Sequence, residues 1–479
     1  MATAGTARVR TRENPELPRA AAFYALKELA RRAGVTAEML RTWRMETDAG
    51  GVLNVFVEPG TNKRIRFFQA APEYWKQIRA GVFRTSRVAW MRPPTEKILE
   101  LVPDFHIPFF STGRDGAGCL FSIAGRDCVE CPADLLASTV LTLGRFEETL
   151  PSPRDQHSRF PAASSIALRD GFLQRPVIDE YGLGFEQALL HLLPQWLPRE
   201  RRLRVKVSHD VDEIGLPFTV RGAVGHAVRR GHPRWTVRDV LAQPLNIETA
   251  YQLLLRQIVG FSVQRGIKPA VYWKASAAGP NDTGYDPGCR RILAMIDDFR
   301  ECGVEIGIHP GYGTFQAREK LSTEVSTLQT LLGDRQLGGR QDYLRWNPQM
   351  WIEWESLGLA YDSSVGFSDA LGFRAGTCYP FRPWIFSESR EADILEIPLL
   401  AMDDTLEPHK NLEPGTALLK VREIVERCRL VGGVFTLVWH NTRIIRPDVR
   451  CFYQTILDEL AGHESYHWKT DYDGSIDAS

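Results

Sequence analysis

The stretch that decides the fold is Arg204-Val205-Lys206-Val207-Ser208-His209-Asp210-Val211-Asp212. Its first residues alternate apolar and polar side chains in the two-residue period of a β-strand. Two carboxylates, Asp210 and Asp212, then arrive at the end of this strand. Buried carboxylates cost free energy unless a cation, a proton or hydrogen-bond donors compensate them. Because α/β enzymes collect catalytic groups at the carboxyl ends of their strands, the stretch predicts a functional site; the alternative is a solvated loop.

Working outward from this strand, the rest of the chain alternates between strand and helix patterns. Further strands are predicted at 269–273, 304–308, 338–341, 360–362, 373–375, 395–400 and 434–439. Helices are predicted at 247–264, 287–302, 315–332, 348–357, 416–430 and 449–461. This alternation predicts parallel strands covered by helices, which is an α/β fold. About seven such units favour a barrel over an open sheet.

Residues 1–202 lack this regular alternation of strands and helices, which predicts that they are organised separately. Residues 1–15 are polar and predicted to be disordered, and 16–150 form a smaller mixed α+β domain. Residues 151–202 connect this domain to the barrel at 203–479 and pack on it. In the mixed domain we expect a helix at 18–33, paired strands at 52–57 and 63–69, a second strand pair at 107–111 and 120–123, and a helix at 133–150. The polar connection reaches over the active site or, alternatively, is a surface linker.

Composition narrows the class of protein. The 479 residues contain 59 Lys plus Arg and 59 Asp plus Glu, so the net charge of zero gives no overall attraction to nucleic acid or anionic membranes. No run is long enough to span a membrane, and the N-terminus lacks the apolar core of an export signal, so we expect a cytoplasmic protein with reduced cysteines. Cys128 and Cys131 form a CxxC without a second ligand pair, which favours ordinary thiols over zinc.

Ionisable residues follow several of the predicted strands. They are His309 after 304–308, Arg340 and Asp342 at the fourth strand, and His440 after 434–439. In a parallel barrel these strand ends meet at one rim. Asp and His side chains suit zinc or a similar divalent ion, which lowers the pKa of a water molecule and polarises a carbonyl. A carboxylate and a histidine beside it would supply base and acid, so metal-assisted hydrolysis is the predicted chemistry.

Four motifs in this order resemble the polysaccharide deacetylase superfamily, which includes carbohydrate esterase family four. They are Ser208-His209-Asp210-Val211-Asp212, Glu305-Ile306-Gly307-Ile308-His309-Pro310, Arg340-Gln341-Asp342-Tyr343 and Leu437-Val438-Trp439-His440. The resemblance covers about residues 203–461 and points to a bacterial branch with an extra N-terminal domain. It implies a distorted (β/α)7 barrel that removes N- or O-acyl groups from sugars, with a divalent metal, expected to be zinc.

The resemblance also implies roles for individual residues. Asp210 matches the catalytic base, Arg340 the arginine that positions it, and His440 the general acid. Asp212 and His309 match metal ligands. Tyr312, Asp342 and Arg374 are expected to contact substrate, although Arg374 has no counterpart in the family motifs.

One departure from the family pattern concerns the metal. The family usually carries a second histidine four residues after the first, and here that position is Gly313. Asp342, His209, His440 or water could replace the missing ligand. The leading hypothesis is a hydrolase that removes an acetyl or formyl group from an N-acylated sugar in surface polysaccharide metabolism. The alternatives are a non-catalytic carbohydrate-binding protein and an amidase with a non-sugar substrate; the sugar, acyl group and oligomeric state stay open.

Overall fold

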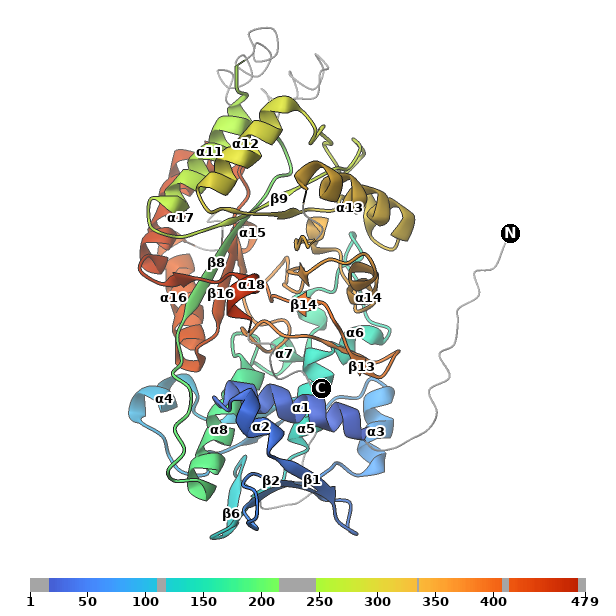
Figure 1. Cartoon of the computed structure of the whole chain (residues 1–479), viewed down its shortest axis with the longest axis vertical. Helices are drawn as coiled ribbons and strands as arrows, with labels where there is room; N and C mark the ends of the chain where they lie inside the picture. The colour runs from blue at the N-terminus through green and yellow to red at the C-terminus, as the bar shows by residue number, and fades with distance from the viewer. Residues whose placement is uncertain (1–16, 110–117, 215–246, 334–335, 407–412, 473–479) are drawn as a thin grey trace, which may run out of the picture.

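The structure is a computed structural model that describes residues 17–109, 118–214, 247–333, 336–406 and 413–472. The predicted disordered N-terminus, 1–15, lies outside these residues. In the described part, a parallel sheet with its helices occupies one end of an elongated molecule, and the N-terminal elements form the other end (Figure 1).

The stretch 204–212 begins with a buried strand, as predicted, and this strand is central in the order β10-β9-β8-β16-β15. Strand β8, Arg204–Asp210, is buried along nearly its whole length. It pairs in parallel with β9, Ala270–Trp273, on one side and with β16, Val434–Val438, on the other. β9 pairs in parallel with β10, Glu305–Ile308, and β16 with β15, Ala401–Met402. Alternating strands and helices therefore produce the α/β arrangement that the sequence predicts.

Beyond β10 the parallel pairing continues through single bridges. Gly339 bridges Ile308 on one side and Asp362 of β11, Tyr361–Asp362, on the other. β11 then pairs in parallel with β14, Leu395–Glu396. A Cβ atom on Gly339 would lie 1.9 Å from the Ile308 carbonyl oxygen, so only glycine permits this close approach. Because β14 is followed directly by β15, segment 395–402 contributes strands to both ends of the run.

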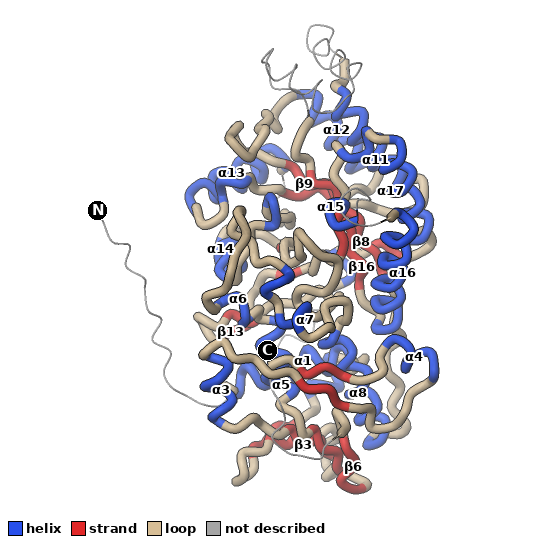
Figure 2. Tube along the Cα trace, turned by 180° about the vertical axis from the view of Figure 1, so that it is seen from behind, coloured by secondary structure: helices blue, strands red, loops and turns tan. Residues whose placement is uncertain are grey.

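Amphipathic helices flank these strands (Figures 1 and 2). They are α11 (Ala250–Val263), α12 (Arg290–Glu301), α13 (Arg318–Leu332), α14 (Gln349–Ser356), α15 (Asp403–Leu406), α16 (Pro414–Val431), α17 (Pro447–Leu460) and α18 (Trp468–Asp471), with a short strand β17 (Glu464–Ser465) and a hairpin of β12 (Trp384–Ile385) and β13 (Arg390–Glu391). The long helices match the predicted ranges to within a few residues. Their apolar stripes, such as Ile292, Met295 and Phe299 in α12, are buried toward the sheet side.

The N-terminal region is mixed α and β. One sheet has the order β1-β2-β3-β7-β6, and a second contains β4 and β5. The strands are β1 (Arg44–Thr47), β2 (Leu53–Phe56), β3 (Arg64–Phe67), β4 (Ser86–Val88), β5 (Phe105–Ile107), β6 (Ser122–Gly125) and β7 (Cys128–Cys131). The helices are α1 (Arg19–Arg32), α2 (Ala37–Arg41), α3 (Pro72–Arg79), α4 (Glu96–Leu101), α5 (Leu135–Leu143), α6 (Phe146–Thr149), α7 (Ile166–Arg169) and α8 (Val177–Leu192).

Three local predictions are wrong. The expected pair 107–111 and 120–123 does not form, because β5 pairs with β4 and β6 pairs with β7. The helix expected at 133–150 is divided into α5 and α6, since Arg145 between them adopts φ 52°. Residues 373–375 form a turn, with Gly376 N–H donating to the Phe373 carbonyl, and not a strand.

The two ends of the molecule share one hydrophobic core. Buried side chains from Leu17 in the N-terminal region to Leu460 in α17 form a single connected cluster. Within it, α8 packs on both α1 and α16. Among the described residues, no helix has the length and apolar character needed to cross a bilayer.

Candidate active site

A cavity of about 750 Å³ opens at the carboxyl ends of the parallel strands. β8 ends at Asp210, β10 ends one residue before His309, and β16 ends two residues before His440. The residues that line the cavity include Asp210, Asp212, His309, Asp342 and His440. Side chains separated by up to 230 residues in sequence thus meet in one pocket, as strand ends in a parallel arrangement allow.

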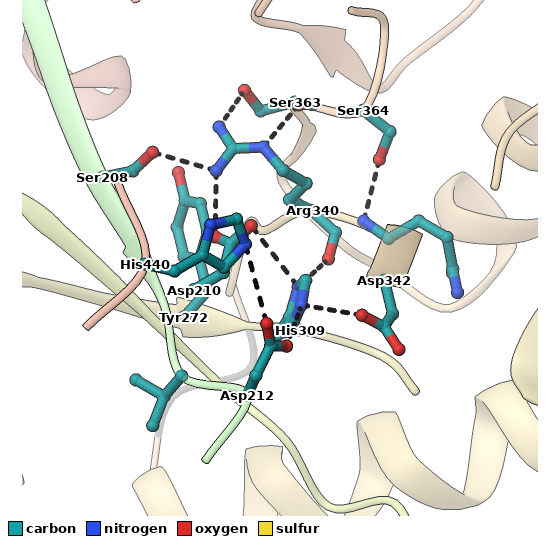
Figure 3. A network of polar contacts seen from close by, with 12 residues as sticks. Ser208, Asp210, Asp212, Tyr272, His309, Arg340, Asp342, Ser363, Ser364 and His440 are labelled. Atoms are coloured by element: carbon teal, nitrogen blue, oxygen red, sulfur yellow. Dashed lines mark hydrogen bonds and ion pairs between the residues drawn. The ribbon is translucent and has the colours of Figure 1, made fainter. Parts of the chain in front are cut away.

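The Arg340 guanidinium fixes the orientation of the Asp210 carboxylate by hydrogen bonding. Its Nη1 donates to Asp210 Oδ1 and to Ser208 Oγ, each at 2.9 Å. Its Nε and Nη2 donate to the carbonyl and the hydroxyl of Ser363 at 2.9 and 3.0 Å. Arg340 is 2% exposed and its guanidinium lies over the ring of Tyr272. Figure 3 shows this network, which holds the Asp210 carboxylate in one orientation.

Asp212, His309 and Asp342 form a cluster with the composition of a metal site. One ligand atom from each lies within 4.8 Å of the others. His309 Nε2 is 3.3 Å from Asp212 Oδ1 and 3.3 Å from Asp342 Oδ1 (Figure 3). His309 Nδ1 donates to the Arg340 carbonyl at 2.7 Å, which turns Nε2 toward the two carboxylates. Such a hydrogen bond to the far ring nitrogen orients histidine ligands in metal sites.

The hydrogen bonding of this cluster also fits a cation. Asp212 Oδ1, His309 Nε2 and Asp342 Oδ2 are buried and form no regular hydrogen bond among the described residues, although ion-pair contacts lie 3.0–3.3 Å away. Buried polar atoms nearly always form hydrogen bonds, so three buried ligand atoms without one favour a bound ion. Oxygen and imidazole donors suit zinc and similar divalent metals. Asp342 is placed to act as a third ligand, a role that Gly313 cannot take.

A lysine that the sequence reasoning missed lies beside these acids. Lys274 follows β9 directly, and its side chain is 3% exposed. Its Nζ is 3.0 Å from Asp212 Oδ1, from Asp342 Oδ2 and from Asp282 Oδ1. Although burial alone would lower it, the three carboxylates raise the pKa of Lys274 well above its ordinary value. Lys274 is therefore charged and neutralises part of the acid cluster.

His440 is held by a carboxylate that was also missed. Asp403 accepts from His440 Nδ1 at 2.9 Å through each of its oxygens, and from the His440 backbone N–H at 2.7 Å. His440 Nε2 faces the cavity, 3.6 Å from Asp212 Oδ2. Burial would lower the pKa of His440, but Asp403 outweighs it and raises this pKa to about 10. The imidazole is protonated at neutral pH and can donate from Nε2.

The pKa values of Asp212 and His309 depend on the charged groups around them. Burial would raise the pKa of Asp212, yet Lys274 and the neighbouring imidazoles hold it well below its ordinary value. Burial would lower the pKa of His309, but Asp210, followed by Asp212 and Asp342, raises it to about 10. The Asp212 carboxylate thus stays ionised and attracts a cation.

A loop from the connecting segment reaches the cavity, which was one of its two predicted roles. Gln156, His157 and Arg159 are among the lining residues. The His157 ring packs against Tyr343, with ring centres 4.9 Å apart, and its Nδ1 lies 3.2 Å from the hydroxyl of Tyr312. His157 and Tyr343 both line the cavity, and the Tyr312 ring packs against both of them.

Some expected site residues lie elsewhere. Arg374 is 2% exposed, does not line the cavity, and donates to Glu148 and to the Gly366 carbonyl instead. His209 points away from the cluster, donates to the Trp439 carbonyl, and has a pKa that burial lowers to about 4. Tyr312 reaches the cavity only through His157, and Gly313 is exposed on the short helix Tyr312–Thr314.

The sequence pattern indicates Lys274 clearly, Asp403 less clearly and Asp282 not at all. Lys274 follows a correctly predicted strand, so the rule that found His309 and His440 applies to it equally. Asp403 follows β15, whose end falls just beyond the predicted strand 395–400. Asp282 lies in an irregular loop, and no sequence period indicates its approach to Lys274.

One family model and several solved structures match this chain. The model of a family of unknown function, DUF7033, matches residues 62–194, and a search among curated proteins finds no match. Among solved structures, the chain is similar to a "putative polysaccharide deacetylase" from Mycobacterium smegmatis, at 16% identity and TM-score 0.38, over 56% of this chain and 86% of the other. A probable polysaccharide deacetylase from Pseudomonas aeruginosa PAO1 shows 14% identity and TM-score 0.38 over 55% and 87%. PuuE allantoinase shows 16% identity and TM-score 0.38 over 59% and 91%.

The first two titles name the superfamily that the sequence motifs resemble.

Proposed function

We propose that this protein is a metal-dependent hydrolase that removes an N-acyl group, acetyl or formyl, from a sugar in surface polysaccharide metabolism. The observation that carries the proposal is the convergence of Asp210, Asp212, His309, Asp342 and His440 on one cavity. The alternative of a non-catalytic binding protein was motivated by Gly313 alone. The position of Asp342 beside Asp212 and His309 weakens that motive.

The chain's own residues supply the acid and the base. Asp210, oriented by Arg340, accepts the proton of an attacking water molecule. His440, held protonated by Asp403, donates its Nε2 proton to the departing amine nitrogen. Asp210 and His440 both line the cavity, so an amide placed between them has a proton acceptor and a proton donor available.

Asp212, His309 and Asp342 would hold the metal. When bound there, a divalent ion polarises the amide carbonyl and lowers the pKa of water, and zinc is the expected ion. Arg340 acts on both parts of the site, because its guanidinium holds Asp210 while its carbonyl accepts from His309 Nδ1. One residue therefore fixes the base and one ligand relative to each other.

We also propose that the parallel strands close into a distorted (β/α)7 barrel. The pairing run from β15 through β16, β8, β9, β10, Gly339 and β11 to β14, with β14 and β15 on one segment, supports closure. The division into an α+β domain at 16–150, a connecting segment at 151–202 and a barrel at 203–479 stays a proposal. Limited proteolysis, followed by mass measurement of the fragments, tests these boundaries.

The test of function is acyl release from a panel of substrates. The full chain is incubated with zinc and with N-acetyl and N-formyl sugars, and acetate and formate are measured. A cyclic amide in the panel detects an amidase with a non-sugar substrate. We expect release from at least one sugar, and a loss of at least about 10³-fold in Asp210→Asn because the base is removed.

The matched control is Asp297→Asn, which neutralises an exposed carboxylate on α12 and should keep full activity. Asp212→Asn should lose zinc as well as activity, whereas Asp210→Asn should retain zinc. No release from any member of the panel, with zinc bound, contradicts the proposal.

A further inference from the structure

The ammonium of Lys274 lies against the same atoms that would bind the metal. Its Nζ is 3.0 Å from Asp212 Oδ1 and from Asp342 Oδ2. These are two of the three buried atoms that would hold the metal. A zinc ion bound to these oxygens would lie about 2.0–2.2 Å from each. Two cations would then share two carboxylates at short range, where they repel each other.

The net charge of the cluster attracts both a divalent metal ion and the Lys274 ammonium. Four carboxylates, Asp210, Asp212, Asp282 and Asp342, face the cations Lys274 and Arg340. This leaves two negative charges when His309 is neutral and the His440 imidazolium is balanced by Asp403. Arg340 is committed to Asp210 and Ser363 on the far side. Lys274 is therefore the protein cation that lies 3.0 Å from both Asp212 and Asp342.

A third acid gives the ammonium a second place to bind. Asp282 is not part of the metal cluster, and its Oδ1 lies 3.0 Å from Lys274 Nζ. Asp282 is itself fixed, since Ser276 Oγ donates to Oδ1 at 3.2 Å and the Tyr312 backbone N–H donates to Oδ2 at 2.8 Å. The ammonium can therefore withdraw toward Asp282 without losing every partner.

We infer that Lys274 competes with the divalent metal for Asp212 and Asp342, and thereby sets how tightly the site holds metal. Lys274 places a positive charge 3.0 Å from two of the three ligand atoms, and this charge weakens metal binding. The metal then exchanges with its surroundings, and occupancy follows the available metal concentration. This inference rests on the proposed function only through the location of its metal site.

The test measures zinc affinity rather than activity. Zinc dissociation constants are determined by competition with a chromophoric chelator for the wild-type chain and for Lys274→Met, which has similar length and no charge. We expect zinc to bind Lys274→Met at least roughly tenfold more tightly, because a unit charge within a few ångströms is removed. The matched control is Lys206→Met, since Lys206 is an equally buried lysine bound to Glu305 at 2.7 Å, away from the ligands. Its affinity should stay within about twofold of the wild type.

Equal or weaker zinc binding by folded Lys274→Met overturns the inference, as does the absence of zinc binding in both proteins. Circular dichroism establishes folding.

If Lys274→Met does not fold, crystals of the wild-type protein soaked in zinc decide the question. We expect Nζ to have left Asp212 and Asp342 while staying on Asp282. Zinc bound at Asp212, His309 and Asp342 with Nζ still beside both carboxylates overturns competition. Acyl release is measured separately, so an inactive chain whose zinc affinity depends on Lys274 rejects the function and keeps the inference.

Discussion

Asp403 holds His440 at three points: both of its oxygens lie 2.9 Å from Nδ1, and one accepts the His440 backbone N–H at 2.7 Å. Asp403 is fully buried, so its charge is poorly screened from the imidazole. This pair orients the ring with Nε2 toward the cavity and keeps it protonated. His440 owes its proposed role as acid to this neighbour.

Asp403→Asn should therefore impair proton donation. The amide cannot stabilise the imidazolium as the carboxylate does, and the wrong tautomer becomes accessible. We expect kcat to fall by about 10²–10⁴-fold. Zinc affinity should be unchanged, because Asp403 touches none of the three ligands. Steady-state kinetics and a zinc titration check both parts, and a variant that keeps its kcat would show that Asp403 only supports the fold.

Arg374 is predicted to stabilise the fold instead of contacting substrate. It joins the segment between β11 and β12 to Glu148 in α6, with its Nε 2.9 Å from Glu148 Oε1. Removing one member of a buried ion pair costs on the order of 3–5 kcal/mol. Arg374→Met should lower the melting temperature, while KM and zinc affinity of the folded fraction stay unchanged.

The control for this prediction is Arg390→Met, which removes a more exposed arginine from its pairs with Glu355 and Glu388. Its cost should stay below about 1 kcal/mol. A large rise in KM for Arg374→Met, without loss of stability, would restore the substrate-contact role.

The residues that sequence reasoning placed correctly share one property. Asp210, His309 and His440 each follow a strand with a clear apolar period, so the location of each strand end was readable. Asp403 and Arg374 depend on short or irregular segments, where no period fixes the direction of a side chain. Sequence patterns thus predict which ends meet, but not which neighbours orient the side chains there.

The N-terminal strand pairing shows the same limit. Strands β2 and β3 are joined by a short turn, and their pairing was predicted correctly. β4 and β5 are separated by α4, and β3 pairs with the distant β7. Pairings between segments far apart in sequence depend on packing that a local pattern does not contain.

His157 is predicted to affect substrate binding rather than the chemical step. It comes from the connecting segment, lines the cavity and packs on Tyr343. His157→Ala should raise KM about three- to tenfold with little change in kcat, since it removes contacts made equally in ground and transition states. The control is His191→Ala, a histidine on α8 outside the cavity. A fall in kcat with KM unchanged would place His157 in the reaction itself.

His106 on β5 is predicted to make stability depend on acid. It is 3% exposed and packs against Phe172. Burial, with a contribution from Arg175, lowers the pKa of His106 to about 4, below its ordinary value of 6.5. Between these two values the unfolded chain binds more protons than the folded one, so stability is lost as the pH falls from about 6.5 toward 4. One pKa unit corresponds to about 1.4 kcal/mol, so this loss is on the order of 2–3 kcal/mol.

In His106→Gln this loss of stability should be absent. The variant is less stable than the wild type at pH 7, and the difference in stability between the two proteins narrows at pH 4.5. Thermal unfolding at both pH values measures the gap, and His191→Gln should keep the acid sensitivity of the wild type. A gap that stays constant or widens at low pH would show that His106 is not the group that titrates.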